Sequence, residues 1–232
     1  MCGRLNVIDD DSVVSLCEQL GLDLGGHVNQ YQGRFIRATQ PVEVLLCNEH
    51  GLQKVPAIWW LLLDKVTHED GEVVFKPSRY TSFNTRVDKL NVPRSAGYQS
   101  FRHQRCVVLV KGFGESQKTS SGMQYTDFMA EEGRCIALAG LYRVWQPGNV
   151  RSFSVITTEA HPKLAPYHQK ASPLMLNQQD DSIRMWLDPS LTDVEQLAPL
   201  LTPTLPQNVV AQPIDKPGNY QPIAPAIAIE RD

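Results

Sequence analysis

The chain has 232 residues, of which 42% are hydrophobic, so it is long enough to bury a sizeable core as one large domain or two small ones. Its net charge of −3 argues against a uniformly basic nucleic-acid-binding protein, and no apolar run approaches the length of a membrane span. The start lacks a basic and apolar signal segment, and the five widely spaced cysteines form no CxxC pair or zinc-like spacing, so we expect a soluble cytoplasmic protein with reduced thiols.

The chain begins with Met1-Cys2-Gly3-Arg4. A small side chain at position 2 permits removal of the initiator methionine, so we expect the mature protein to begin with Cys2 and to carry a free α-amine and a thiol on that residue. These groups titrate near about 8 and about 8.5, so both are partly nucleophilic at neutral pH. The pair can condense with an aldehyde to a thiazolidine, or cleave an amide as an N-terminal nucleophile. The alternative is that Cys2 is a small buried hydrophobe.

The first predicted element after this start is a helix. Asp9–Asp11 offer an N-cap and favourable charges at its beginning, and Gly21 is expected to end it. Residues 21–40 are rich in glycine and polar groups. We expect them to form a loop that carries Arg34 and Arg37.

Two strands are predicted next, Pro41–Cys47 and Leu52–Trp60, joined by a turn at residues 48–51. This arrangement is typical of a hairpin. The two tryptophans that end the second strand are either core residues or an exposed wedge. Residues 64–82 are polar and are expected to form a surface loop.

Apolar or alternating runs predict further strands at Arg105–Lys111, Tyr125–Ala130, Arg134–Leu141 and Arg151–Thr158. Helices are predicted at Asp180–Leu187 and after a capping box at Thr192–Glu195. The proline-rich segment 205–232 is expected to wrap the surface, with Gln207–Ile214 as an edge strand. We find no repeat or linker. The sequence therefore predicts a single α+β domain over residues 1–232, with a mostly antiparallel, barrel-like β core and a few flanking helices.

Charge is unevenly distributed along the chain. Between Lys76 and Lys118 there are nine basic and two acidic residues, a local charge of +7, so the remainder carries −10. Aromatic residues are interleaved with these cations, which is typical of a single-strand DNA-binding surface. A solvated basic face with aromatic residues in the core is the alternative.

Four segments together resemble the SOS response-associated peptidase (SRAP) family, whose members attach covalently to abasic sites in single-stranded DNA. They are Met1–Arg4, Ser82–Asp88, Lys111–Glu115, and Val155–Thr158 followed ten residues later by His168. The resemblance extends from Cys2 to about Pro173. The segments after Trp59 and after His168 depart from the family pattern, which indicates a divergent branch.

The resemblance implies roles for individual residues. Cys2 is the residue that links to DNA, and Asn84 forms hydrogen bonds near it. Glu115 and His168 transfer protons, which a carboxyl and an imidazole can do when their pKa values lie near neutral. The residues expected to contact DNA are Arg4, Arg34, Arg37, Trp60, Arg86, Arg94, Arg105 and Lys170.

The first hypothesis is therefore a sensor that crosslinks to abasic sites in single-stranded DNA through a thiazolidine, shields the lesion and reverses the link. It implies an enzyme with lyase-like chemistry from a family also described as peptidases, without cofactor or metal. We expect a monomer, associated with the nucleoid when bound to DNA, that meets replication and repair proteins but no membrane. The alternatives are an N-terminal-nucleophile amidohydrolase or peptidase, and a DNA-binding module without a covalent step.

Overall fold

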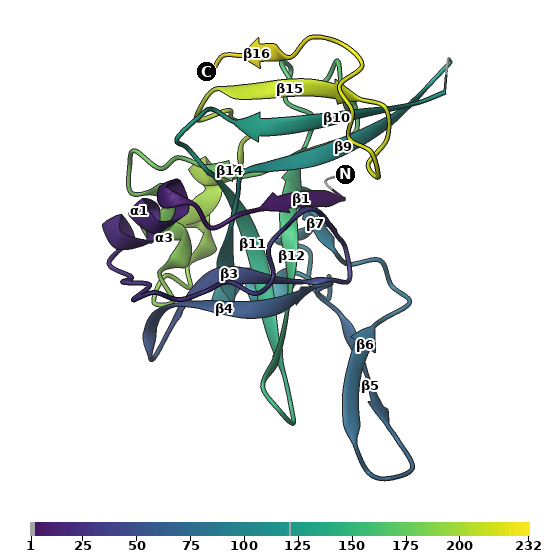
Figure 1. The fold of residues 1–232 in the computed structure, drawn as a ribbon. Coiled ribbons are helices and arrows are strands. Elements are labelled where there is room, and N and C mark those ends of the chain that lie inside the picture. The colour runs from purple at the N-terminus through teal and green to yellow at the C-terminus, as the bar shows by residue number, and fades with distance from the viewer. Residues whose placement is uncertain (1–2, 121) are drawn as a thin grey trace.

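The computed structural model describes residues 3–120 and 122–232. Strands dominate these residues, and short helices lie mainly on one side of them (Figure 1). Most strand pairs are antiparallel; the parallel pairs among the described strands are those of β12 with β4 and with β7. The predicted single α+β domain with a mostly antiparallel, barrel-like core is confirmed.

The first sheet contains six of the described strands in the order β16-β15-β10-β9-β1-β2, and each neighbouring pair is antiparallel. Its strands are β1 (Arg4–Val7), β2 (Gly33–Arg37), β9 (Gly112–Thr119), β10 (Gly122–Ala130), β15 (Val209–Ile214) and β16 (Ile227–Ile229). Strand β1 therefore lies beside β9, more than a hundred residues away in sequence.

The second sheet contains eight of the described strands. They are β3 (Pro41–Asn48), β4 (Gly51–Trp59), β7 (Asn84–Arg86), β8 (Arg105–Val110), β11 (Ile136–Trp145), β12 (Val150–Thr158), β13 (Ser172–Pro173) and β14 (Met175–Leu176). Strand β8 is buried at every position, and after Arg105 its sequence is a continuous apolar run. A separate hairpin of β5 (Leu63–Thr67) and β6 (Val73–Pro77) projects away from both sheets (Figure 1).

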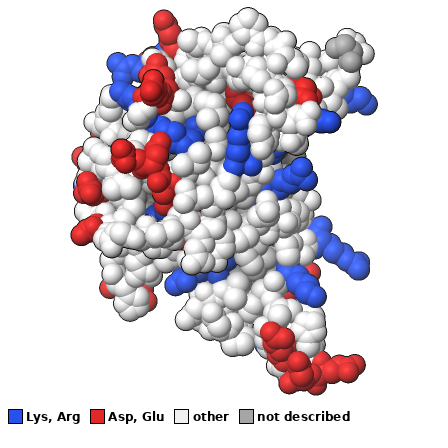
Figure 2. Space-filling view, in the orientation of Figure 1, with Lys and Arg blue, Asp and Glu red and all other residues white. Residues whose placement is uncertain are grey.

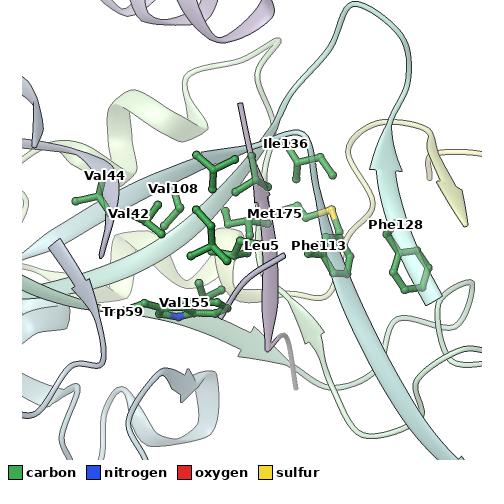
Figure 3. Packing of buried hydrophobic residues seen from close by; sticks show 14 of the residues in the cluster. Leu5, Val42, Val44, Trp59, Val108, Phe113, Phe128, Ile136, Val155 and Met175 are labelled. Carbon is green, nitrogen blue, oxygen red and sulfur yellow. The ribbon is translucent and has the colours of Figure 1, made fainter. Parts of the chain in front are cut away.

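The main core lies between the two sheets (Figure 3). Leu5 and Phe113 enter it from the first sheet, and Phe113 stacks on Phe128 with ring centroids 4.9 Å apart. Trp59 and Val155 enter it from the second sheet. Trp59 is fully buried, so of the two alternatives left by the sequence the first tryptophan belongs to the core.

The helices enclose a second apolar cluster that includes Phe101 and Trp186. They are α1 (Asp11–Leu20), α2 (Tyr98–His103), α3 (Ser182–Leu187) and the 3-10 helices Val87–Lys89 and Val194–Leu201. The predicted first helix is confirmed. Asp10 caps it by accepting from two backbone N–H groups, and Gly21 ends it with φ 93°.

Several predicted elements are wrong. The expected loop 21–40 contains β2, because Ile36 pairs with Leu5 and is buried there. The expected loop 64–82 contains the β5–β6 hairpin. The expected helix after residue 192 is a 3-10 helix with Pro199 inside it. The expected edge strand at 207–214 is β15, which is paired on both sides by β10 and β16.

Candidate functional site

The first feature of the site is a buried carboxyl on β9. Side chains alternate across a strand, so Glu115 faces the same side as the core residue Phe113 and is 2% exposed. Burial raises the pKa of Glu115 to about 7, and the positive charge of Arg4 limits this rise. Near neutral pH the carboxyl is therefore present in both protonation states and can donate or accept a proton.

His168 contacts this carboxyl. Its Nδ1 lies 3.6 Å from Glu115 Oε2 and 3.1 Å from the carbonyl oxygen of Ser116. Burial lowers the pKa of His168 to about 4, and the charge of Lys170 acts in the same direction, so the imidazole is neutral at pH 7. Since a carbonyl oxygen only accepts, Nδ1 carries the proton and Nε2 is the unprotonated nitrogen.

The contact between Glu115 and His168 is not an ion pair at neutral pH. An ion pair lowers the pKa of the acid and raises that of the imidazole. Here both pKa values move the opposite way, because loss of water is the largest cause for each group. The two groups are therefore not a fixed pair of opposite charges at neutral pH.

A cleft of about 480 Å³ opens at His168. It is lined by Gly3, Phe83, Ser116, Gln117, Lys118, Met123, His168, Gln169 and Lys170. The backbone N–H of Gln169 donates to the Gln117 side chain (2.9 Å), which joins the segment after His168 to β9. Gly3 follows the predicted nucleophile directly, and Cys2 itself lies outside the described residues.

Asn84 begins the short strand β7 next to Phe83 of the cleft. Strand β7 is fixed to β12 by pairing of Asn84 with Val155 and by a 2.8 Å hydrogen bond between the hydroxyls of Thr85 and Ser154. The fold thus brings three of the four predicted catalytic positions to one region. Glu115 and His168 are in contact, and Asn84 is half-buried beside a cleft residue.

Arg4 differs from its predicted role as a DNA contact. It is 8% exposed, and its guanidinium donates to the carbonyl oxygen of Glu115 at 2.9 Å. The same group lies over the rings of Phe35 and Tyr125. It is therefore a buried cation of the first sheet.

Arg105 also differs from its predicted role. It is 4% exposed, and its guanidinium donates to the carbonyl oxygens of Trp186 (2.7 Å), Phe101 (2.8 Å) and Leu191 (3.0 Å). The Phe101 and Trp186 oxygens belong to the last turns of α2 and α3, and Leu191 follows α3. The predicted phosphate contact is wrong because this cation joins two helices inside the protein.

The other predicted DNA contacts are at the surface or at its edge. Arg34 forms an ion pair with the buried Asp127 (3.0 Å), and Arg86 forms one with Asp88 (2.8 Å). The remaining exposed cations of the set are Arg37, Arg94 and Lys170, of which Lys170 lines the cleft.

Trp60 lies between the cleft and the β5–β6 hairpin. It is half-buried, its ring is tilted against that of Phe83 with centroids 5.6 Å apart, and its N–H donates to the Ser78 carbonyl.

Sequence reasoning missed Gln117, Met123 and Gln169 as cleft residues. Lys118 could have been identified, because it belongs to the basic segment between residues 76 and 118. The other three residues belong to no sequence pattern that indicates a site.

On the face seen in Figure 2, many acidic groups lie over the α1 side and at the tip of the β5–β6 hairpin. Many basic groups lie on the side opposite α1, near the N-terminal end of β1, although groups of both signs occur on each side. Within residues 3–120 and 122–232, no group of three or more His, Cys, Asp or Glu side chains is placed to hold a metal ion. No helix of the same residues is long and apolar enough to cross a membrane.

Known proteins resemble this chain over most of its length. The family model "SOS response associated peptidase (SRAP)" matches residues 1–219. The abasic site processing protein HMCES of Xenopus tropicalis is 24% identical over 254 residues, which cover 92% of this chain and 73% of that protein. The abasic site processing protein YoqW of Bacillus subtilis is 23% identical over 211 residues, covering 88% and 87%.

Solved structures share the fold. A protein from Bacteroides thetaiotaomicron superposes with a TM-score of 0.66 at 19% identity and covers 91% of both chains. A protein from Bordetella bronchiseptica gives a TM-score of 0.66 at 14% identity over 100% of both chains. At these identities the likeness shows the fold alone.

Proposed function

Because the chain belongs to the SOS response associated peptidase family, we propose that it processes abasic sites in single-stranded DNA by forming a covalent link through Cys2 after removal of Met1. Relatives named abasic site processing proteins support the lesion as substrate. The observation that carries the proposal is the contact of Glu115 with His168 beside a cleft that Gly3 lines.

The proposed reaction joins the aminothiol to the open-chain aldehyde of the abasic sugar. The amine nitrogen adds to the aldehyde carbon, and water leaves to give a protonated imine. The thiol gives up its proton, which balances the proton taken up by the departing hydroxyl. The thiolate sulfur then adds to the same carbon, and the electron pair of the C=N bond returns to the nitrogen, which becomes a neutral secondary amine. The products are a thiazolidine and one water, with no oxidation or reduction.

The buried pair supplies the proton transfers. The Glu115 carboxyl, with a pKa of about 7, protonates the departing hydroxyl and removes a proton from the amine. Neutral His168 offers the lone pair of Nε2 while its Nδ1–H is held by the Ser116 carbonyl. Asn84 orients the amine or the sugar hydroxyl without competing for protons. Reversal runs through the same steps, with Glu115 protonating the leaving sulfur or nitrogen.

The residues that line the cleft are suited to bind single-stranded DNA. Lys118 and Lys170 are exposed cations on its lining, where they can hold phosphates, and Phe83 and Met123 offer apolar contact to sugar or base. Further exposed cations that can contact phosphates lie outside the cleft; they are Arg37, Arg86 and Arg94.

The test is a crosslinking assay with single-stranded DNA that contains one abasic site. We expect a band of lower mobility on a denaturing gel with the wild type, loss of that band with Cys2→Ala, and its retention with the matched control Cys47→Ala. Intact mass should show that Met1 has been removed. Absence of the band, its persistence in Cys2→Ala, or a retained Met1 overturns the proposal. Peptide turnover that DNA does not inhibit favours an amidohydrolase instead.

A further inference from the structure

A stack of rings and guanidinium groups lies on the first sheet, on the side away from the Glu115 carboxyl. The order is Tyr125, Arg4, Phe35, Arg34, Tyr220, and successive members are 5.6, 5.3, 5.2 and 4.4 Å apart from ring centroid to guanidinium carbon. We call this set the cation–aromatic stack. Such contacts are attractive, and they strengthen when the cation is shielded from water.

The inner cation of the stack is fitted to the strand that carries Glu115. Arg4 pairs with Gly114 in register, and a Cβ atom on Gly114 would lie 2.5 Å from Nε of Arg4. Only glycine at this position leaves room for the guanidinium. Because Arg4 also donates to the Glu115 carbonyl, the stack contacts the backbone of the proposed catalytic residue directly.

The outer part of the stack is held by strained backbone and by a buried charge. Phe35 and Tyr220 have φ of 64° and 42°, in the left-handed region that residues with side chains rarely adopt. Such conformations persist only where the surroundings enforce them, and they cluster at functional sites. Asp127, 1% exposed, accepts from Arg34 at 3.0 Å and balances the charge there.

We propose that Tyr220 is a positioning residue: by packing on Arg34 and Phe35 it holds Arg4, and with it the strand end that leads to Cys2, against Glu115. The inference rests on the proposed function. Tyr220 lies just beyond the residues that the family model matches, in the loop between β15 and β16. A segment late in the chain thus fixes the beginning of β1.

The test compares Tyr220→Ala with Tyr220→Phe, which keeps the ring, and with Ile223→Ala, an exposed apolar residue of the same loop. Single-turnover crosslinking is measured over a range of DNA concentrations. We expect Tyr220→Ala to lower the maximal rate about 10-fold, because small misplacements of reacting groups are costly. The half-saturating DNA concentration should not change. Tyr220→Phe and Ile223→Ala should behave as the wild type.

A second readout follows from the charge of Arg4, which lowers the pKa of Glu115. When Arg4 is no longer held, the inflection of the rate with pH should move to higher pH in Tyr220→Ala. An unchanged maximal rate in Tyr220→Ala overturns the proposal. A higher half-saturating DNA concentration with no change in maximal rate also overturns it, because that result indicates that Tyr220 contacts DNA. If Tyr220→Ala does not fold, Tyr220→Leu, which keeps apolar packing without a ring face, takes its place.

A third measurement separates this proposal from the proposed function. Condensation of the protein with propanal, followed by intact mass, reports the reactivity of the aminothiol without DNA. If the wild type fails to crosslink DNA but Tyr220→Ala slows condensation with propanal, the proposed function fails and the positioning role stands. If DNA crosslinking occurs and neither reaction responds to Tyr220→Ala, the positioning role fails alone.

Discussion

Glu115 owes its chemistry to its surroundings. Burial removes water from the carboxyl and raises its pKa to about 7, and the nearby Arg4 does not reverse that shift. The sequence could identify a glutamate of the right type next to a glycine-rich segment. It could not decide whether burial or the basic block determines the pKa, because the burial of position 115 depends on which face of β9 meets the core.

Glu115→Gln tests this carboxyl as the proton-transfer group. The amide has nearly the same shape but does not titrate, so we expect the crosslinking rate to fall by about 10²-fold. The inflection of the rate near pH 7 should disappear, while any inflection due to the α-amine remains. Rates measured from pH 5.5 to 9 check this, and a variant that keeps the inflection near 7 assigns it to another group.

The same substitution predicts a change in stability with a definite sign. The folded state holds the Glu115 proton up to about pH 7, whereas an unperturbed carboxyl loses it near 4.5, so wild-type stability falls as the pH rises between these values. Glu115→Gln removes this loss. We expect the variant to gain up to about 3 kcal/mol relative to the wild type at pH 8 and little at pH 4.5. Urea unfolding at both pH values measures the difference in the free energy of unfolding between the variant and the wild type. If this difference is the same at pH 4.5 and pH 8, the raised pKa does not belong to Glu115.

Elements that begin or end at a local sequence signal, such as a helix cap or a turn, could be predicted. Strands that form only because a distant strand pairs with them could not. The cap at Asp10 and the left-handed Gly21 fix α1, and the turn after Asn48 fixes the β3–β4 hairpin. Strand β2 has a polar, glycine-flanked sequence and forms because β1 pairs with it. Its left-handed Phe35 could not be foreseen, since the residues that hold it come from distant segments.

Arg105 shows how one residue joins elements. Its guanidinium satisfies carbonyl oxygens near the ends of α2 and α3, so we expect Arg105→Met to leave buried acceptors without a donor and to destabilise the protein by about 3 kcal/mol. Urea unfolding measures the loss, with the exposed Arg79→Met as the control. The salt dependence of DNA binding should be unchanged in folded Arg105→Met. A reduced dependence indicates that this cation reaches phosphate.

Across the whole molecule, the candidate site is assembled from segments that the sequence keeps far apart. Gly3, Phe83, β9 and the segment after His168 meet because β1 pairs with β9 and β7 with β12. The chemical types of Glu115 and His168 were predictable from their motifs. The cleft residues Gln117 and Met123 were not, because only the meeting of the two sheets gives them a role.

The charge distribution leads to a prediction for the molecule as a whole. The net charge is −3, yet Lys118 and Lys170 line one cleft, so binding of single-stranded DNA should weaken with salt in proportion to the phosphates these cations contact. If each neutralises one phosphate, the double variant Lys118→Ala/Lys170→Ala should reduce the slope of log K against log salt by roughly 1.4. The control is Arg231→Ala, an exposed cation on a separate cavity. Binding is measured with Cys2→Ala protein, so that no covalent step contributes. If the slope of log K against log salt is unchanged in the double variant, or changes equally in the control, the DNA does not bind along this cleft.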